Sequence, residues 1–78
     1  MKKPRKITPE IAGKLMGKGA VFVREAMKAG DLTIGVALQM PESQKWSFFI
    51  SPSRLAEYLG IEVKELRALV EEMHNEAS

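Results

Sequence analysis

Three stretches of this sequence have the apolar spacing of an α-helix, and each stops at a glycine: Gly17, Gly30 and Gly60. Glycine readily adopts the left-handed backbone conformation that closes a helix, so all three helices are expected to be short. Thr8 before Pro9, and Ser51 before Pro52, supply the hydroxyl N-cap and the first-turn proline that mark helix starts. Helices this short are marginal in water, so they must share one hydrophobic core with the rest of the chain.

The first two helices are separated only by Gly17, Lys18 and Gly19, which predicts a helix-turn-helix. The first helix presents an apolar stripe made of Ile11, Ala12, Leu15 and Met16. The second presents Phe22, Val23, Ala26 and Met27, and the helix that starts at Pro52 presents Leu55, Tyr58 and Leu59. These stripes predict the faces that pack on the core.

The apolar period changes to two beyond Asp31, which predicts a two-stranded β-hairpin. Ile34, Val36 and Leu38 alternate with smaller or polar residues, and a second alternating segment carries Trp46, Phe48 and Ile50. Residues 40–45, most of them polar, form the turn. We expect Trp46 and Phe48 to pack in the core, whereas Phe49 either covers the terminal helix or lies on the surface.

The chain ends in a predicted amphipathic helix from about Val63 to His74. Its apolar stripe folds back on the core, forms a homodimer or docks on another protein such as a recombinase, and the stripe consists of Val63, Leu66, Val70 and Met73. Residues 61–78 carry five acids and two bases, whereas residues 1–60 carry ten bases and five acids. The basic part has the charge expected of a nucleic-acid-binding body.

Several functions are disfavoured by what the sequence lacks. It has no cysteine, and His74 is its only histidine, so neither a zinc site nor nucleophilic catalysis is expected. His74 is expected at the surface, near the end of the terminal helix. We therefore expect no enzyme activity, no metal and no cofactor. No apolar run approaches the roughly 18 residues of a membrane span, and no apolar core follows the basic N-terminus as in a signal peptide. We expect no membrane association and a cytoplasmic location.

The expected fold class is α+β: a winged helix-turn-helix, with a hairpin wing, a closing helix and a C-terminal helix. In this order, residues 7–60 resemble the winged-helix domains of the excisionase and MerR-like DNA-binding families. The resemblance covers 54 of the 78 residues and rests on three segments: TPEIAGKLMGKG, FVREAMKAGDL and KWSFFISPSRLAEYLG. The chain differs from commoner members in its long acidic C-terminal helix, and in Gly19 and Ala20 where a polar cap often starts the second helix.

The resemblance implies double-stranded DNA as partner, with the second helix in the major groove. Arg24 is the candidate base reader, because its guanidinium can make two hydrogen bonds to guanine. Lys18 and Lys28 suit phosphates, and Glu25 either accepts from cytosine or positions Arg24. Alternatively, Arg24 and Lys28 are solvated charges on an exposed helix face, paired with Glu25 or Asp31. The wing would reach the flanking backbone or minor groove, and basic arms of other proteins lie there too. The DNA-contacting set is Lys18, Val21, Arg24, Glu25, Lys28, Ser43, Gln44, Lys45, Lys2, Lys3, Arg5 and Lys6.

We thus expect a basic flexible arm (1–7), a winged-helix DNA-binding domain (8–60) and an acidic amphipathic helix (61–78). The expected function is that of an excisionase, a recombination directionality factor of a bacterial or phage mobile element, associated with the nucleoid. Two alternatives stay open. One is a small transcriptional regulator with the same fold. The other is a protein-interaction module that never binds DNA.

Overall fold

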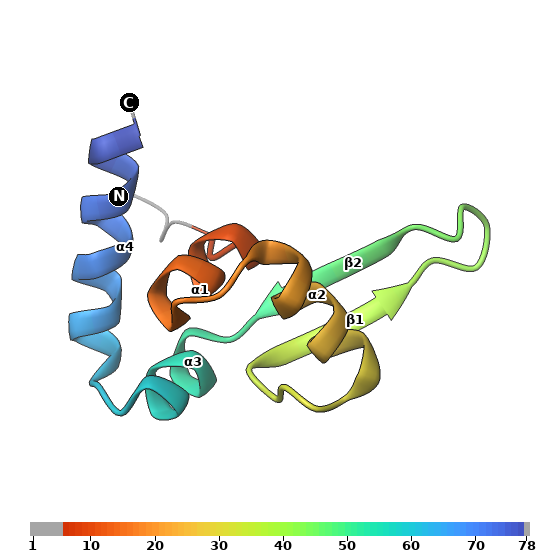
Figure 1. Cartoon of the computed structure of the whole chain (residues 1–78), viewed down its shortest axis with the longest axis horizontal. Coiled ribbons are helices and arrows are strands. Elements are labelled where there is room, and N and C mark those ends of the chain that lie inside the picture. Colours follow the sequence, from red (N-terminus) through yellow and green to blue (C-terminus); the bar gives the residue numbers. More distant parts are fainter. Residues whose placement is uncertain (1–5, 78) are drawn as a thin grey trace.

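The computed structural model describes residues 6–77 and shows a small α+β fold. It contains α1 (Pro9–Met16), α2 (Ala20–Ala29), β1 (Gly35–Gln39), β2 (Trp46–Ile50), α3 (Pro52–Leu59) and α4 (Val63–Ala77). β1 and β2 pair as an antiparallel hairpin. α4 and the hairpin tip lie at opposite ends of the longest axis, with the three shorter helices between them (Figure 1). This layout is compatible with a winged helix.

The predicted helix ends are confirmed by their cap geometry. The Thr8 side-chain oxygen accepts from the Ile11 N–H at 3.3 Å, and the Ser51 oxygen accepts from the Arg54 N–H at 3.3 Å. α1, α2 and α3 each end at a left-handed glycine, with φ values of 74°, 80° and 75°. α2 starts at Gly19 without a side-chain cap, as its sequence implied.

One core joins all four helices to the connections around the hairpin. Its buried residues are Ile7, Ala12, Val23, Met27, Leu32, Ile34, Leu55, Ala56, Leu66 and Val70. The expected inner residues of α2, Val23 and Met27, are 0% and 6% exposed, and Ala26 packs against the core. The inner face of α2 is therefore confirmed.

The apolar stripe of α4 belongs to this same core. Leu66 is 0% exposed and Val70 is 3% exposed, whereas Val63 and Met73 are half-buried. Of the three arrangements that the sequence left open for this stripe, packing within the chain is the one that the structure contains. Leu66 and Val70 are thus covered within the chain, whereas Val63 and Met73 remain partly exposed.

α1 and α2 approach closely enough to fix the direction of α2. A side chain at Gly13 would place its Cβ 2.6 Å from the Lys18 carbonyl oxygen, so only glycine allows this contact between the helix and the turn. The Lys18 N–H donates to the Gly13 carbonyl at 2.7 Å. The turn between the two helices is thus anchored on the middle of α1.

The face of β1 that packs against the core is not the more apolar face that its sequence alternation indicated. Val36 pairs with Phe49, and Ala37 pairs with Phe48. Ala37, Phe48 and Ile50 pack against the core, so the inner face joins small residues of β1 to large residues of β2. The more apolar face of β1 points outward: Val36, Leu38 and Phe49 are 51–52% exposed. Of the two positions expected for Phe49, the surface is the one observed. Trp46 was expected in the core with Phe48, but it is half-buried outside the core, beside Lys28.

Three further expectations need correction. Phe22 and Tyr58 were expected in the apolar stripes of their helices, but they are 50% and 60% exposed because each lies at the solvent edge of its stripe. His74 is half-buried, and its Nε2 is buried without a hydrogen-bond partner, although a surface position was expected at that end of the chain. Among the helices described, none is long and apolar enough to cross a lipid bilayer.

Candidate nucleic-acid interface

The outer side of α2 carries the residues that the sequence singled out for DNA contact. Val21 is 68% exposed, and Glu25 and Lys28 are exposed as well. Arg24 is less open, with 37% of its side chain exposed. The core side of the same helix is filled by Val23 and Met27, so the orientation of α2 is set by burial and its outer side is left for other contacts.

Arg24 forms an ion pair that the sequence did not reveal. Its Nη2 donates to Oε1 of Glu10, which lies in the first turn of α1 and is 54% exposed. Pairing with Glu25 or Asp31 had been considered for Arg24, but neither pairing is observed. Because Glu10 and Arg24 lie on different helices, only the packing of α1 on α2 brings them together. The only sequence signal for Glu10 was its place in a first turn.

The structure holds Glu10 in its ionised form. The pKa of the Glu10 carboxyl is lowered, mainly because its own backbone N–H donates to it, and further because the Thr8 hydroxyl donates to it and Arg24 lies beside it. Slight burial acts in the opposite direction. An acid in the first turn of a helix is also favoured by the helix dipole. Glu10 therefore presents a fixed negative charge to Arg24.

Lys28 is engaged on two sides. Its Nζ lies 3.1 Å from Oε2 of Glu25, one turn earlier on α2, and 5.2 Å from the centre of the Trp46 ring on β2. A cation at that distance from an indole ring is attracted to it. Lys28 consequently links the outer side of α2 to the edge strand of the hairpin. Glu25 thus pairs with Lys28, whereas the acid that contacts Arg24 is Glu10 of α1.

A groove runs between the start of α1, α2 and β2, and Arg24 lies in its wall. Its volume is about 390 Å³. The lining combines two cations, an acid and aromatic rings, and it consists of Lys6, Thr8, Pro9, Glu10, Arg24, Trp46, Ser47, Phe48 and Phe49. A run of neighbouring β2 residues faces the groove, so the groove follows this strand. Basic and aromatic groups in one groove suit a polyanion that carries planar bases.

Of the two further expected lysines near the helices, Lys6 lines this groove and Lys18 does not. Lys18 is exposed, with its Nζ 5.4 Å from the Phe22 ring centre. Lys6 is also exposed, and its Nζ lies 5.8 Å from the Phe49 ring centre. The other arm residues Lys2, Lys3 and Arg5 lie outside the described part of the chain. Neither Lys6 nor Lys18 forms an ion pair with any residue that the structure describes.

The hairpin tip presents polar groups at the far end of the molecule (Figure 1). Ser43, Gln44 and Lys45 are all exposed. The tip is closed by local hydrogen bonds: the Lys45 N–H donates to the Ser43 hydroxyl at 3.4 Å, and the Gln39 side chain donates to the Gln44 carbonyl at 3.3 Å. The turn is therefore ordered by its own contacts, and the side chain of Lys45 remains available.

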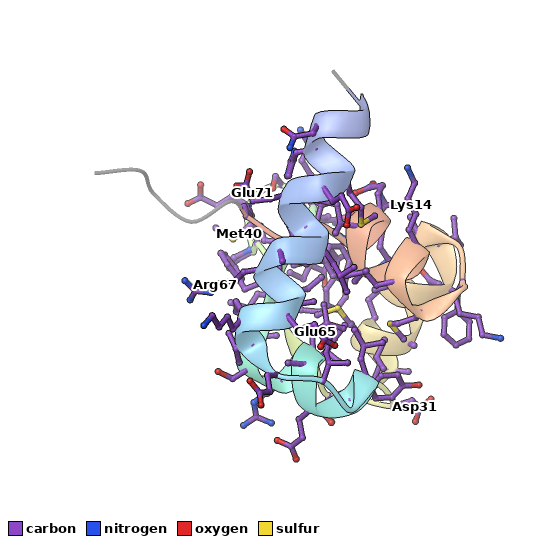
Figure 2. The ribbon with its side chains drawn as sticks, turned by 90° about the vertical axis from the view of Figure 1, so that its left-hand side faces the viewer. Lys14, Asp31, Met40, Glu65, Arg67 and Glu71 are labelled. Carbon is purple, nitrogen blue, oxygen red and sulfur yellow. The ribbon has the colours of Figure 1, made fainter. Side chains whose placement is uncertain are left out.

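At the other end of the molecule, the outer side of α4 has more acids than bases. The outer side of α4 carries Glu65, Glu71 and Glu72 together with Lys64 and Arg67, all exposed. Arg67 and Glu71 project away from α1 and α2 (Figure 2). Within the described residues, no group of three or more histidine, cysteine or acidic residues is placed to hold a metal ion.

No protein-family model, characterised protein or solved structure matches this chain.

Proposed function

We propose that this chain is a sequence-specific double-stranded DNA-binding protein with a winged-helix fold. α2 enters the major groove, and the hairpin acts as a wing against the flanking backbone or minor groove. One observation carries the proposal: Arg24 and Lys28 lie on the side of α2 next to β2, away from the core residues Val23 and Met27. A helix fits the major groove, and an arginine there can read guanine through two hydrogen bonds.

The two ion pairs on this surface are compatible with DNA binding. Both are partly exposed, and ion pairs near the surface contribute only about 0–1 kcal/mol, so neither pair prevents its cation from contacting DNA. In this proposal Arg24 reads bases, whereas Lys18, Lys28 and Lys45 contact phosphates. Such phosphate contacts add affinity that falls as salt rises, but they add little sequence information.

The proposal extends to the biological role through the resemblance to excisionases. An excisionase binds beside a recombination site and directs excision, whereas a regulator with the same fold binds beside a promoter. The two roles can be separated by selecting bound sites from a randomised duplex pool. The genomic positions of the matching sequences then distinguish recombination sites from promoters.

The test of DNA binding is a fluorescence-anisotropy titration of the protein with a labelled random duplex at two salt concentrations. The proposal predicts binding that weakens several-fold or more as the salt concentration rises. Binding that does not change with salt, or no binding to duplexes from the randomised pool, would contradict it. The doubly substituted chain Lys18→Ala, Lys45→Ala serves as the matched variant and should bind more weakly.

A protein-interaction module is the second candidate, and one observation favours it. The outer face of the hairpin carries four half-exposed apolar side chains, those of Val36, Leu38, Met40 and Phe49. Contiguous apolar surface on a small protein often marks a binding site. If this candidate is correct, Leu38→Ser should abolish binding of the partner protein without changing the affinity for a DNA duplex. If DNA binding is the function, the loss of duplex affinity should follow the Lys18 and Lys45 substitutions instead.

A further inference from the structure

We propose that Glu10 is a specificity-determining residue, whose carboxylate holds the Arg24 guanidinium and directs it toward bases in preference to phosphates. The inference rests on the proposed DNA-binding function and adds to it a residue that has no direct role in reading the DNA. Glu10 acts through Arg24 and is therefore a positioning residue.

The first step is geometric. The Glu10–Arg24 pair joins the first turn of α1 to the outer side of α2, at the groove that also contains Lys6, Trp46 and Phe49. Both partners are partly exposed, so DNA in this groove would meet the pair and not a lone arginine. The contact between Gly13 and the turn before α2 keeps the two helices at a fixed spacing, so the pair is built into the fold.

The second step concerns how firmly Glu10 is held. Its carboxylate accepts from its own backbone N–H and from the Thr8 hydroxyl, which also caps α1 through the Ile11 N–H. The same interactions lower the pKa of the Glu10 carboxyl, so the acid is charged at neutral pH. Arg24 therefore lies beside a carboxylate that carries its full charge at neutral pH.

A phosphate and the edge of a base differ in charge, and therefore in how they interact with the carboxylate of Glu10 beside Arg24. A phosphate is an anion, so Glu10 repels it at the position where Arg24 would attract it. The acceptors of guanine, O6 and N7, are neutral and meet no such repulsion. A guanidinium has five N–H donors, and the contact with Glu10 leaves several of them for a base. The pair thus weakens backbone contacts by Arg24 more than base contacts.

The other ion pair on α2, between Glu25 and Lys28, does not hold a guanidinium that could read a base. Lys28 is held by Glu25 from the same helix and by the Trp46 ring, and an ammonium has no planar fork that could read a base. Removing the charge of Glu25 should therefore change the affinity for all duplexes alike. This makes Glu10, and not Glu25, the acid expected to govern discrimination.

The experiment compares Glu10→Gln with Glu72→Gln, which removes the same charge from the exposed side of α4. Affinity is measured for a selected site and for a random duplex over a series of salt concentrations. For Glu10→Gln we expect random-duplex binding about tenfold tighter near 0.1 M salt, with a salt slope steeper by about one phosphate contact. The selected site should tighten by less than about threefold, so selectivity falls. Glu72→Gln should keep the wild-type selectivity.

Two further variants keep the test decisive. Glu10→Asp retains the charge and should retain the wild-type ratio of affinities, which covers the case in which Glu10→Gln weakens α1. In an Arg24→Ala background, Glu10→Gln should no longer change that ratio, because the two residues act as one unit.

Equal tightening of both duplexes by Glu10→Gln, or an unchanged effect in the Arg24→Ala background, would overturn the inference while leaving DNA binding intact. A wild-type protein without salt-dependent binding to either duplex would overturn both the inference and the proposed function. The two failures are therefore distinguishable.

Discussion

α2 and α4 each pack an apolar side against the core, but they differ in the charged residues on the sides that they present to solvent. Each packs two apolar residues into the core, Val23 and Met27 from α2 and Leu66 and Val70 from α4. The outer side of α2 lies beside the hairpin and carries cations that meet aromatic rings and acids. The outer side of α4 carries three of the acids of the charged C-terminal segment.

An apolar stripe therefore identifies the side on which a helix packs, but the function of the helix depends on the residues of its outer side. In the proposed complex α2 faces the DNA, and α4 lies at the end of the long axis away from the hairpin tip (Figure 1). An acidic surface facing away from the polyanion adds no repulsion at close range, because charges separated by more than about 10 Å are largely screened at 0.1 M salt. The predictions below test this division between the two helices.

The largest expected effect is on stability, at the buried side of α4. Leu66→Ala should lower the free energy of unfolding by about 2–5 kcal/mol, because it leaves a cavity in the only core that the described residues form. Chemical denaturation monitored by circular dichroism measures the change. Glu72→Gln, on the outer side of the same helix, should alter stability by less than about 0.5 kcal/mol. If Leu66→Ala unfolds like the wild type, the stripe of α4 is not a core element.

The next effect is on discrimination, at the outer side of α2. Arg24→Ala should reduce the preference for the selected site by about 1–3 kcal/mol, as expected for loss of a two-bond contact with guanine. Stability should change by no more than about 1 kcal/mol, because the ion pair with Glu10 is exposed. Competition binding with single-base variants of the site measures the effect. A uniform loss over all duplexes would show that Arg24 contacts only the backbone.

A smaller effect is expected on the salt dependence of DNA binding, where Lys45 and Lys28 should differ. Lys45→Ala should reduce the salt slope by about one unit, because this tip residue forms no ion pair with the residues described. Lys28→Ala should reduce the slope by less, because Glu25 already neutralises part of its charge. Titrations over a salt series give both slopes. Equal slopes would show that the Glu25–Lys28 pair opens fully on DNA.

The smallest effect is on the pH dependence of folding. Since the pKa of the Glu10 carboxyl is lowered by folding, its contribution to stability is present above the unfolded value near 4.5 and is lost as pH falls through the folded value. NMR titration of the Glu10 side chain should show this lowered pKa. In Arg24→Ala it should rise only part of the way, because the backbone N–H and Thr8 still donate. A complete return to the ordinary value would make Arg24 the main cause.

The local features of the fold could be predicted from the sequence because their causes are local. Hydroxyl caps at Thr8 and Ser51 and the left-handed glycines depend on neighbouring residues, so helix boundaries follow from short segments. The buried face of the hairpin could not be predicted in this way. Val36 and Leu38 looked like core residues, yet the core is filled from β2 by Phe48 and Ile50.

In the candidate site, too, the positions of residues on one helix could be predicted, but the contacts between elements could not. The outer position of α2 residues such as Val21 followed from helical geometry, and the structure agrees. The partner of Arg24 did not follow, because Glu10 is 14 residues away and reaches Arg24 only through the packing of α1 on α2. The contact of Lys28 with Trp46 likewise depends on where the hairpin lies against α2. Contacts between elements require the fold as well as the sequence pattern.

The most direct test of the central claim is an NMR titration of the ¹⁵N-labelled protein with the selected duplex. If α2 and the hairpin bind DNA, the largest chemical-shift changes should occur at Val21, Lys28 and Ser47, on α2 and β2, with small changes at Arg67 and Glu72 on α4. Changes concentrated on α4, or no changes at saturating duplex, would contradict the assignment of α2 and the hairpin as the DNA-binding surface.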